Sequence, residues 1–227
     1  MKAMILAAGK GERLQPLTNH TPKPLIKVAG KSVVEHTISN LVKMGIEDIV
    51  INTWHLADKL TDFVGSGNQW GAKVLFSNED RLLNTGGGVR NALDKLGDGP
   101  TILVNGDILW SLDLQPLLTK YNPKKMDAML GLTTNPHYKK SDFSCKAEGG
   151  NIQRAEGKDD GYTYTGIMIF SPQTLLKYPL QPFSLNRFFD DKMVEKRLFG
   201  LPLHGEWADM GTHARLAQVQ KEWGVSY

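Results

Sequence analysis

Two cationic side chains and a glycine-rich turn lie close together near the start of the chain. An apolar run over residues 1–8 ends at the sequence G-K-G-E-R, which places Arg13 just after two glycines. Glycines let backbone N–H groups approach a phosphate, because no Cβ atom stands in the way. Shortly afterwards Lys23 lies between two prolines, so that a stiff backbone presents its ammonium group at a fixed place. This combination indicates triphosphate chemistry, with Arg13 and Lys23 as the catalytic cations.

Two well-known phosphate loops do not fit this turn. A dinucleotide-binding loop has the pattern G-x-G-x-x-G and opens directly into a helix, whereas here Leu14 takes the third glycine position and Pro16 interrupts the helix. The P-loop pattern G-x-x-x-x-G-K-[ST] does not occur in the chain. An NAD-dependent oxidoreductase is therefore disfavoured.

Two aspartates from distant segments are candidate metal ligands. Asp107 follows an apolar run in the sequence L-V-N-G-D, and Asp209 lies in W-A-D-M-G-T near the end of the chain. Mg²⁺ is typically held by one or two carboxylates together with substrate oxygens and water. We therefore expect Asp107 and Asp209 to converge on one or two Mg²⁺ ions.

Apolar runs of strand type alternate with segments of helical periodicity. This alternation predicts an α/β fold with a Rossmann-like mixed, mostly parallel sheet and helices on both faces. Ligands of such sheets bind beyond the carboxyl ends of the strands. The expected strands are 1–8, 48–52, 72–76, 101–105, 127–133, 142–147 and 163–170, and the expected helices are 33–44, 56–64, 87–96, 185–196 and 212–223.

Length, charge and composition limit the domain organisation and the partners that the chain can have. The 227 residues contain no linker or repeat, which predicts a single domain over 1–227. The net charge of +3 is spread along the chain, so we expect no nucleic-acid partner, and no apolar run is long enough for a membrane span. A lone cysteine, Cys145, fits the reducing cytoplasm. A monomer is expected.

The string L-A-A-G-x-G-x-R followed by P-K-P-L resembles the signature of the sugar-1-phosphate nucleotidylyltransferases, also called nucleotide-sugar pyrophosphorylases. Together with N-T-G-G-G, L-V-N-G-D, Y-T-G-I and W-A-D-M-G-T, the resemblance covers nearly the whole chain and is closest to the short bacterial N-acetylmuramate-1-phosphate uridylyltransferases. It implies transfer of a nucleotidyl group from a nucleoside triphosphate, with UTP favoured, to a sugar-1-phosphate. It also implies a nucleotide-binding half (about 1–110) and a sugar-binding half (about 111–227) of the single domain. The implied product is UDP-N-acetylmuramate for peptidoglycan recycling. The chain ends at residue 227, so we expect none of the C-terminal β-helix domain of bifunctional relatives.

The chemistry and the resemblance together assign roles to residues. We expect the turn around Gly9, Lys10 and Gly11 to cradle the triphosphate, Arg13 to clamp the β- and γ-phosphates, and Lys23 to hold the α-phosphate and the sugar phosphate. The resemblance places the remaining nucleotide contacts, including those to the base, at Ala7, Ala8, Glu79, Thr85, Gly86, Gly87 and Asn105. The candidate sugar contacts are Asp142, Thr165 and Gly166.

One departure from the family pattern leaves the sugar open. Larger members carry an E-K-P motif before the Y-T-G-I strand, whereas this chain has Q-R-A-E-G at residues 153–157. Mannose-1-phosphate guanylyl-, glucose-1-phosphate thymidylyl- or uridylyl- and choline-phosphate cytidylyltransferases are therefore alternatives. A nucleotide-binding regulatory module without catalysis is the non-enzymatic alternative.

Overall fold

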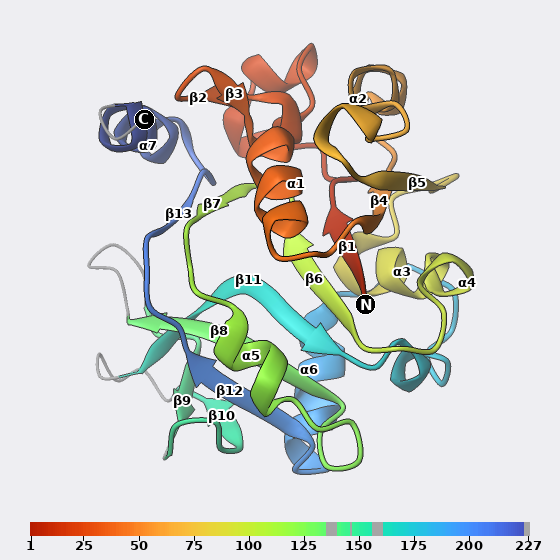
Figure 1. The fold of residues 1–227 in the computed structure, drawn as a ribbon, viewed down its shortest axis with the longest axis vertical. Coiled ribbons are helices and arrows are strands. Elements are labelled where there is room, and N and C mark those ends of the chain that lie inside the picture. Colours follow the sequence, from red (N-terminus) through yellow and green to blue (C-terminus); the bar gives the residue numbers. More distant parts are fainter. Residues whose placement is uncertain (135–139, 146, 156–160, 225–227) are drawn as a thin grey trace.

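The computed structural model describes residues 1–134, 140–145, 147–155 and 161–224. Its centre is a mixed sheet with the order β10-β9-β11-β6-β1-β4-β5, to which β8 and β12 attach through β11 (Figure 1). The parallel part is formed by β1 (Lys2–Leu6), β4 (Asp48–Thr53), β5 (Lys73–Asn78) and β6 (Thr101–Asn105). The prediction of an α/β fold with a mixed, mostly parallel sheet is confirmed.

The second half of the chain joins the sheet through an antiparallel strand. β11 (Tyr162–Phe170) pairs with β6 and also with β8 (Ala128–Thr134), and β12 (Leu198–Pro202) extends the sheet in parallel with β8. The short strands β9 (Phe143–Cys145) and β10 (Ile152–Arg154) complete this edge. The predicted strand 142–147 includes residue 146, which lies outside the described residues.

Alternating side chains of β1 face two separate hydrophobic cores. Ala3 and Ile5 pack on one side of the sheet, and Met4 packs on the other. The first face is covered by α1 (Val33–Lys43), α2 (Ala57–Val64) and α5 (Gln115–Lys120). The second face is covered by α3 (Asn84–Asn91), α4 (Leu93–Leu96) and α6 (Leu185–Val194). The predicted covering of both faces by helices is therefore observed.

Local sequence explains where helix α1 begins and ends. Ser32 and Glu35 form a capping box, in which the Ser32 hydroxyl accepts the Glu35 N–H and the Glu35 carboxylate accepts the Ser32 N–H. Gly45, with a left-handed φ of 77°, follows the last residues of the helix. The buried residues Val34, Ile38 and Leu41 follow helical spacing and face the sheet.

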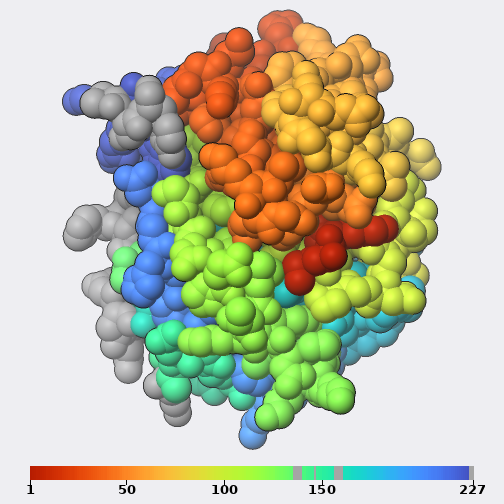
Figure 2. Space-filling model, viewed as in Figure 1, coloured from red at the N-terminus to blue at the C-terminus, as the bar shows by residue number. Residues whose placement is uncertain are grey.

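A third hydrophobic core lies beneath the C-terminal helix. Helix α7 (His213–Gly224) packs beside the ribbon formed by β2 (Lys27–Val28) and β3 (Lys31–Ser32) (Figure 1). A small two-stranded sheet of β7 (Ile108–Trp110) and β13 (Trp207–Asp209) leads into α7. Figure 2 shows the green middle of the chain on the surface between its orange N-terminal part and its blue C-terminal part.

The sequence pattern missed the short elements and one helix start. The unpredicted elements are β2, β3, β7, β10, β12, β13, α5 and the 3-10 helices Glu12–Leu14, Leu17–Asn19, Lys23–Leu25, Asn68–Trp70 and Pro172–Leu175. The helix predicted from 87 begins at Asn84 and breaks at Ala92 into α3 and α4. Its first turns contain glycines with low helix propensity, so tertiary packing decides this start. No helix in the described ranges is long and apolar enough to cross a membrane.

Candidate active site

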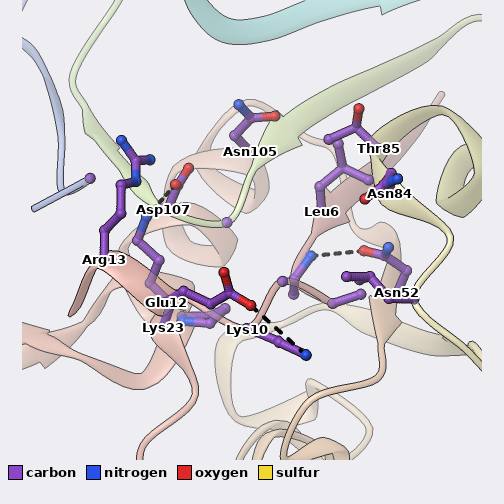
Figure 3. A pocket seen from close by; sticks show the side chains of 18 of the residues that line it. Leu6, Lys10, Glu12, Arg13, Lys23, Asn52, Asn84, Thr85, Asn105 and Asp107 are labelled. Carbon is purple, nitrogen blue, oxygen red and sulfur yellow. Dashed lines mark hydrogen bonds and ion pairs between the residues drawn. The ribbon is translucent and has the colours of Figure 1, made fainter. Parts of the chain in front are cut away.

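A cavity of about 770 Å³ opens at the carboxyl ends of β1, β4 and β6 (Figure 3). This is the edge at which parallel α/β sheets bind ligands. The lining residues come from segments that are far apart in the sequence. They are residues 6–13, Lys23, Pro24, Asn52, Leu82, Asn84, Thr85, residues 105–107, Ser184 and Gly211.

The glycine turn after β1 is supported from behind and open toward the cavity. Gly11 has a left-handed φ of 66°, and a Cβ atom at this position would lie 2.8 Å from Thr18 Cγ2. The Thr18 hydroxyl donates a hydrogen bond to the Gly11 carbonyl at 2.9 Å. A Cβ atom at Gly9, in contrast, would meet nothing within 4 Å. The turn therefore lets a ligand approach the backbone at Gly9.

The charged end of the cavity contains Lys10, Glu12, Arg13, Lys23 and Asp107. The Lys23 ammonium and the Asp107 carboxylate form an ion pair at 2.5 Å, and the Lys23 side chain is only 11% exposed. Lys10 lies 3.8 Å from Glu12 and over the ring of Trp54. The cationic side chains come from the 3-10 turns and loops that follow β1. At Lys23 the flanking prolines stiffen the backbone. This arrangement can hold a polyanion.

Asp209 and Asp107 are brought together by the small sheet of β7 and β13. In this ladder Asp209 lies opposite Ile108, and the Met210 N–H donates to the Asp107 carbonyl at 3.1 Å. Asp209 accepts the Gly211 N–H at 3.0 Å, and a Cβ atom on Gly211 would lie 3.3 Å from the guanidinium of Arg13. The two predicted metal ligands thus lie on neighbouring segments, although they are far apart in the sequence, and only Asp107 lines the cavity.

The donor set at these aspartates suits a hard divalent cation that is shared with substrate. Carboxylate oxygens are the ligands that Mg²⁺ prefers, and Mg²⁺ often takes only one or two of them. Within the described ranges, no group of three or more His, Cys, Asp or Glu side chains is placed to hold a metal on its own. The carboxylate of Asp107, which lines the cavity, therefore suits an ion that also binds phosphate oxygens, and joint binding by Asp209 stays a prediction.

The opposite end of the cavity is built from neutral amides and hydroxyls. The Asn52 side chain is 2% exposed, its Oδ1 accepts the Ala7 N–H at 2.7 Å, and its Nδ2 donates to Glu79 Oε1 at 2.7 Å. Glu79 Oε2 accepts the Leu83 N–H at 2.8 Å. Burial raises the pKa of the Glu79 carboxyl above its ordinary value, against the hydrogen bonds from Leu83 and Asn52 that lower it.

Glu79 therefore supports the cavity wall from behind, where the sequence had placed it among the nucleotide contacts. We name the hydrogen-bonded set Ala7, Asn52, Glu79 and Leu83 the amide network. It connects the ends of β1 and β4 with the segment before α3. Asn52 was missed by the sequence analysis, although it ends a buried strand just as Asn105 does.

The glycines of α3 allow other parts of the protein to pack closely against the helix. The N–H groups of Gly86 and Gly87 both donate to the Phe183 carbonyl, at 2.9 and 3.2 Å. A Cβ atom on Gly86 would lie 2.3 Å from the Phe183 ring, and one on Gly88 would lie 2.7 Å from both Asn52 Nδ2 and Glu79 Oε1. Gly86 and Gly87, predicted to contact the nucleotide, do not line the cavity, whereas their neighbours Asn84 and Thr85 do.

The three candidate sugar residues lie outside the cavity lining. Asp142 accepts the Tyr164 N–H at 2.9 Å. Thr165 is fully buried, and its hydroxyl donates to the Gly131 carbonyl at 2.7 Å. Gly166, with φ 81°, packs behind Asn105, because a Cβ atom there would lie 2.8 Å from Asn105 Nδ2. Sugar contacts by these residues remain a prediction.

The structure collects most of the predicted nucleotide and phosphate residues around one cavity. The predicted residues that line it are Ala7, Ala8, Gly9, Lys10, Gly11, Arg13, Lys23, Thr85, Asn105 and Asp107. Lining residues that the sequence analysis did not single out include Glu12, Asn52, Leu82 and Ser184. Asn84, the first residue of the N-T-G-G-G cluster, also lines the cavity, whereas nothing local in the sequence marks Ser184.

Comparisons with known proteins agree with this geometry. The family model described as nucleotidyl transferase matches residues 2–224. An N-acetylmuramate alpha-1-phosphate uridylyltransferase of Neisseria meningitidis serogroup B is 36% identical over 97% of this chain and 97% of its own. A mannose-1-phosphate guanyltransferase beta-B of Xenopus laevis is 29% identical over 93% of this chain and 61% of its own.

The fold has a close counterpart among solved structures. A UDP-glucose pyrophosphorylase from Acinetobacter baumanii superposes with a TM-score of 0.84, covering 100% of this chain and 94% of its own, at 15% identity. At that identity the likeness concerns the fold. The match of the family model to nearly the whole chain, around a cavity with paired cations and carboxylates, shows that the protein belongs to the nucleotidyl transferase family and is a sugar-1-phosphate nucleotidyltransferase.

Proposed function

We propose that this protein is a Mg²⁺-dependent uridylyltransferase that converts UTP and N-acetylmuramate-1-phosphate into UDP-N-acetylmuramate and pyrophosphate. The observation that carries the proposal is the placement of Arg13, Lys23 and Asp107 around one end of the cavity, with neutral amides at the other. Asp209 lies on the strand that pairs with the segment after Asp107. The choice of uridine and N-acetylmuramate is supported by the relative that is 36% identical over nearly its full length. Its place would be the recycling of peptidoglycan in the cytoplasm.

The charged end supplies what nucleotidyl transfer needs. An oxygen of the sugar phosphate forms a bond to the α-phosphorus while the bond to the bridging oxygen breaks, and pyrophosphate leaves with that oxygen. No general base is required, because the attacking phosphate oxygen is already ionised. Catalysis then consists of holding two polyanions together and stabilising the charge that develops between them.

Each charged residue has a distinct task in this proposal. The Arg13 guanidinium, with its planar fork of donors, holds the β- and γ-phosphates and stabilises the departing pyrophosphate. The Lys23 ammonium reaches the α-phosphate and the incoming sugar phosphate. Asp107 and Asp209 would hold the ion, which when bound neutralises phosphate charge. Lys23 and Asp107 form an ion pair in the structure, so binding of phosphate and of an ion at these side chains would require both to exchange partners.

A screen of four nucleoside triphosphates against a panel of sugar-1-phosphates tests the proposal through pyrophosphate release. UTP with N-acetylmuramate-1-phosphate should give the highest kcat/KM. The proposed specificity fails if GTP with mannose-1-phosphate or TTP or UTP with glucose-1-phosphate gives a higher value. If the protein binds triphosphates and releases no pyrophosphate with any pair, it is a nucleotide-binding module and the enzymatic proposal is wrong.

A further inference from the structure

The turn that carries Arg13 is short and lies at the surface of the cavity. It is the 3-10 helix Glu12–Leu14, in which Arg13 is exposed and Leu14 is fully buried in the third hydrophobic core. A long, exposed arginine side chain has many rotamers, and restricting them on binding costs conformational entropy. The place of the guanidinium in the cavity (Figure 3) therefore depends on what else contacts this turn.

The start of helix α7 holds the end of the turn. The His213 Nε2–H donates to the Gln15 carbonyl at 2.9 Å, across 198 positions of the sequence. A carbonyl oxygen only accepts, so the Nε2 atom is the donor. Gln15 closes the turn, because its N–H donates to the Glu12 carbonyl at 3.2 Å. The C-terminal helix thus fixes the backbone directly after the turn of Arg13.

Gly211, just before α7, limits where the guanidinium can lie. A Cβ atom at this position would lie 3.3 Å from both terminal nitrogens of Arg13 and 3.1 Å from Asp209 Oδ1. A methyl group there would displace its neighbours by a few tenths of an ångström, whereas glycine leaves the space to the guanidinium. Gly211 is also part of the cavity lining. Its backbone is therefore a wall beside the Arg13 side chain.

The segment that makes both contacts is itself anchored at its two ends. The Met210 N–H donates to the Asp107 carbonyl at 3.1 Å. The Thr212 carbonyl accepts the Leu216 N–H at 2.9 Å and so begins the helix. Leu216 is buried in the same hydrophobic core as Leu14. The segment can therefore act as a fixed support for the turn.

We propose that His213 and Gly211 are positioning residues for the Arg13 guanidinium, an inference that rests on the proposed nucleotidyl transfer. His213 acts through the backbone of the turn, and Gly211 acts through the space that it leaves. A charge stabilises a transition state best when it is already in place, because no reorganisation is then needed during the reaction. Misplacing a catalytic group by about 1 Å can lower the rate about 10²-fold. Both residues should therefore influence kcat although neither carries the charge.

Three variants test the two contacts. His213→Phe keeps an aromatic ring and removes the donor. His213→Gln places an amide nitrogen close to the position of Nε2 and can restore the hydrogen bond. Gly211→Ala adds a methyl group beside the guanidinium.

Two residues of the same helix provide matched controls. Gln220 Nε2 donates to the Lys27 carbonyl at 3.1 Å, so Gln220→Leu removes a comparable bond between α7 and the rest of the protein. Gly224→Ala adds a methyl group where nothing lies within 4 Å. Gln220 and Gly224 both lie outside the cavity lining. They control for a general loosening of α7 and for added bulk.

Pyrophosphate release is measured with the substrate pair that has the highest kcat/KM. His213→Phe and Gly211→Ala should lower kcat about tenfold, because the guanidinium is displaced by less than 1 Å. The KM of the sugar-1-phosphate should change less than about twofold, because Arg13 does not hold this substrate. His213→Gln should recover most of the lost rate. Gln220→Leu and Gly224→Ala should keep the wild-type kcat.

Combining each substitution with Arg13→Ala distinguishes positioning from a general structural role. If His213 and Gly211 act through the guanidinium, His213→Phe and Gly211→Ala should have no further effect on kcat once the guanidinium is gone. Equal losses with and without the guanidinium would overturn the inference. A wild-type kcat in either single variant, or an equal loss in Gln220→Leu, would also overturn it.

The outcomes separate this inference from the proposed function. A wild type that releases no pyrophosphate with any substrate pair refutes the proposed function, and the inference falls with it. An active wild type that is impaired by Arg13→Ala and unaffected by His213→Phe refutes the inference alone. Thermal unfolding shows whether each variant is folded, and the loss of stability in His213→Phe should be small because His213 is exposed.

Discussion

At one end of the cavity Arg13, Lys23 and Asp107 present full charges, and at the other end Asn52, Asn84 and Thr85 present neutral amides and a hydroxyl (Figure 3). The charged side chains project from turns and loops and have few internal partners beyond the pair of Lys23 with Asp107. The neutral end is backed by the buried amide network. The charged side chains at the first end can therefore bind a ligand without disturbing the fold. The polar side chains behind the neutral end, in contrast, also stabilise the fold.

The difference predicts different consequences of substitution. Removing an exposed or half-exposed charge changes stability little, because water already solvates it. Removing or crowding one partner of a buried network leaves another polar group without a hydrogen bond, which costs about 1–3 kcal/mol. Substitutions at the charged end should thus affect turnover, and substitutions behind the neutral end should affect stability and nucleotide affinity together.

The largest effect is expected from Arg13→Ala and Lys23→Met. Each removes a cation that stabilises charge in the transition state, so kcat should fall at least ~10²-fold. The melting temperature of Arg13→Ala should remain close to that of the wild type, because Arg13 is exposed. Lys23→Met should lower it moderately, because the Lys23 side chain is only 11% exposed and pairs with Asp107. Steady-state pyrophosphate release and thermal unfolding measure the two quantities. Lys31→Met removes an exposed lysine outside the cavity and is the control. A large loss of stability with unchanged kcat would show that these cations stabilise the fold and do not take part in catalysis.

The next effect concerns the paired aspartates. Asp209→Asn removes one charged oxygen donor, so the Mg²⁺ concentration that gives half-maximal rate should rise at least about tenfold. Saturating Mg²⁺ should restore part of the rate. Asp113→Asn changes an exposed aspartate outside the cavity lining and should leave the Mg²⁺ dependence unchanged. An unchanged Mg²⁺ dependence in Asp209→Asn would exclude this residue as a ligand.

A smaller effect is expected behind the neutral end, at Gly88. The Cβ atom in Gly88→Ala would lie 2.7 Å from both Asn52 Nδ2 and Glu79 Oε1, so the amide network must move or break. We expect the free energy of unfolding to fall by about 2 kcal/mol and the KM for UTP to rise. Gly99→Ala is a matched control, because nothing lies within 4 Å of its Cβ position. Equal stabilities of the two variants would show that the network tolerates crowding.

The sequence predicted the charged end far better than the neutral end, and the reason is physical. A lysine between two prolines and an arginine after a glycine turn bring their chemistry with them, so a local pattern is enough to find them. Thr85 and Glu79 are positioned by contacts with Leu185 and Asn52, which no local pattern contains. The small sheet that joins Asp209 to Ile108 was likewise missed, because three-residue strands leave too short a periodic signal.

The same network gives the smallest and most specific effect, a dependence of stability on pH. Burial raises the pKa of Glu79, so the folded state binds its proton more tightly than the unfolded chain does. The contribution of Glu79 to stability is therefore greatest below the unfolded pKa of about 4.5 and declines as pH rises through the folded pKa.

Chemical unfolding of the wild type and Glu79→Gln across this pH range isolates the contribution. Glu79→Gln cannot titrate, and its amide nitrogen cannot accept the hydrogen bond from Asn52 or Leu83, so it should be less stable than the wild type. Its deficit should be largest at acidic pH and should shrink as pH rises, because the wild type then loses the stability that its protonated carboxyl supplied. A deficit that grows with pH would mean that the hydrogen bonds to the carboxylate outweigh its burial, and Glu79 would then act as a buried charge facing the neutral end.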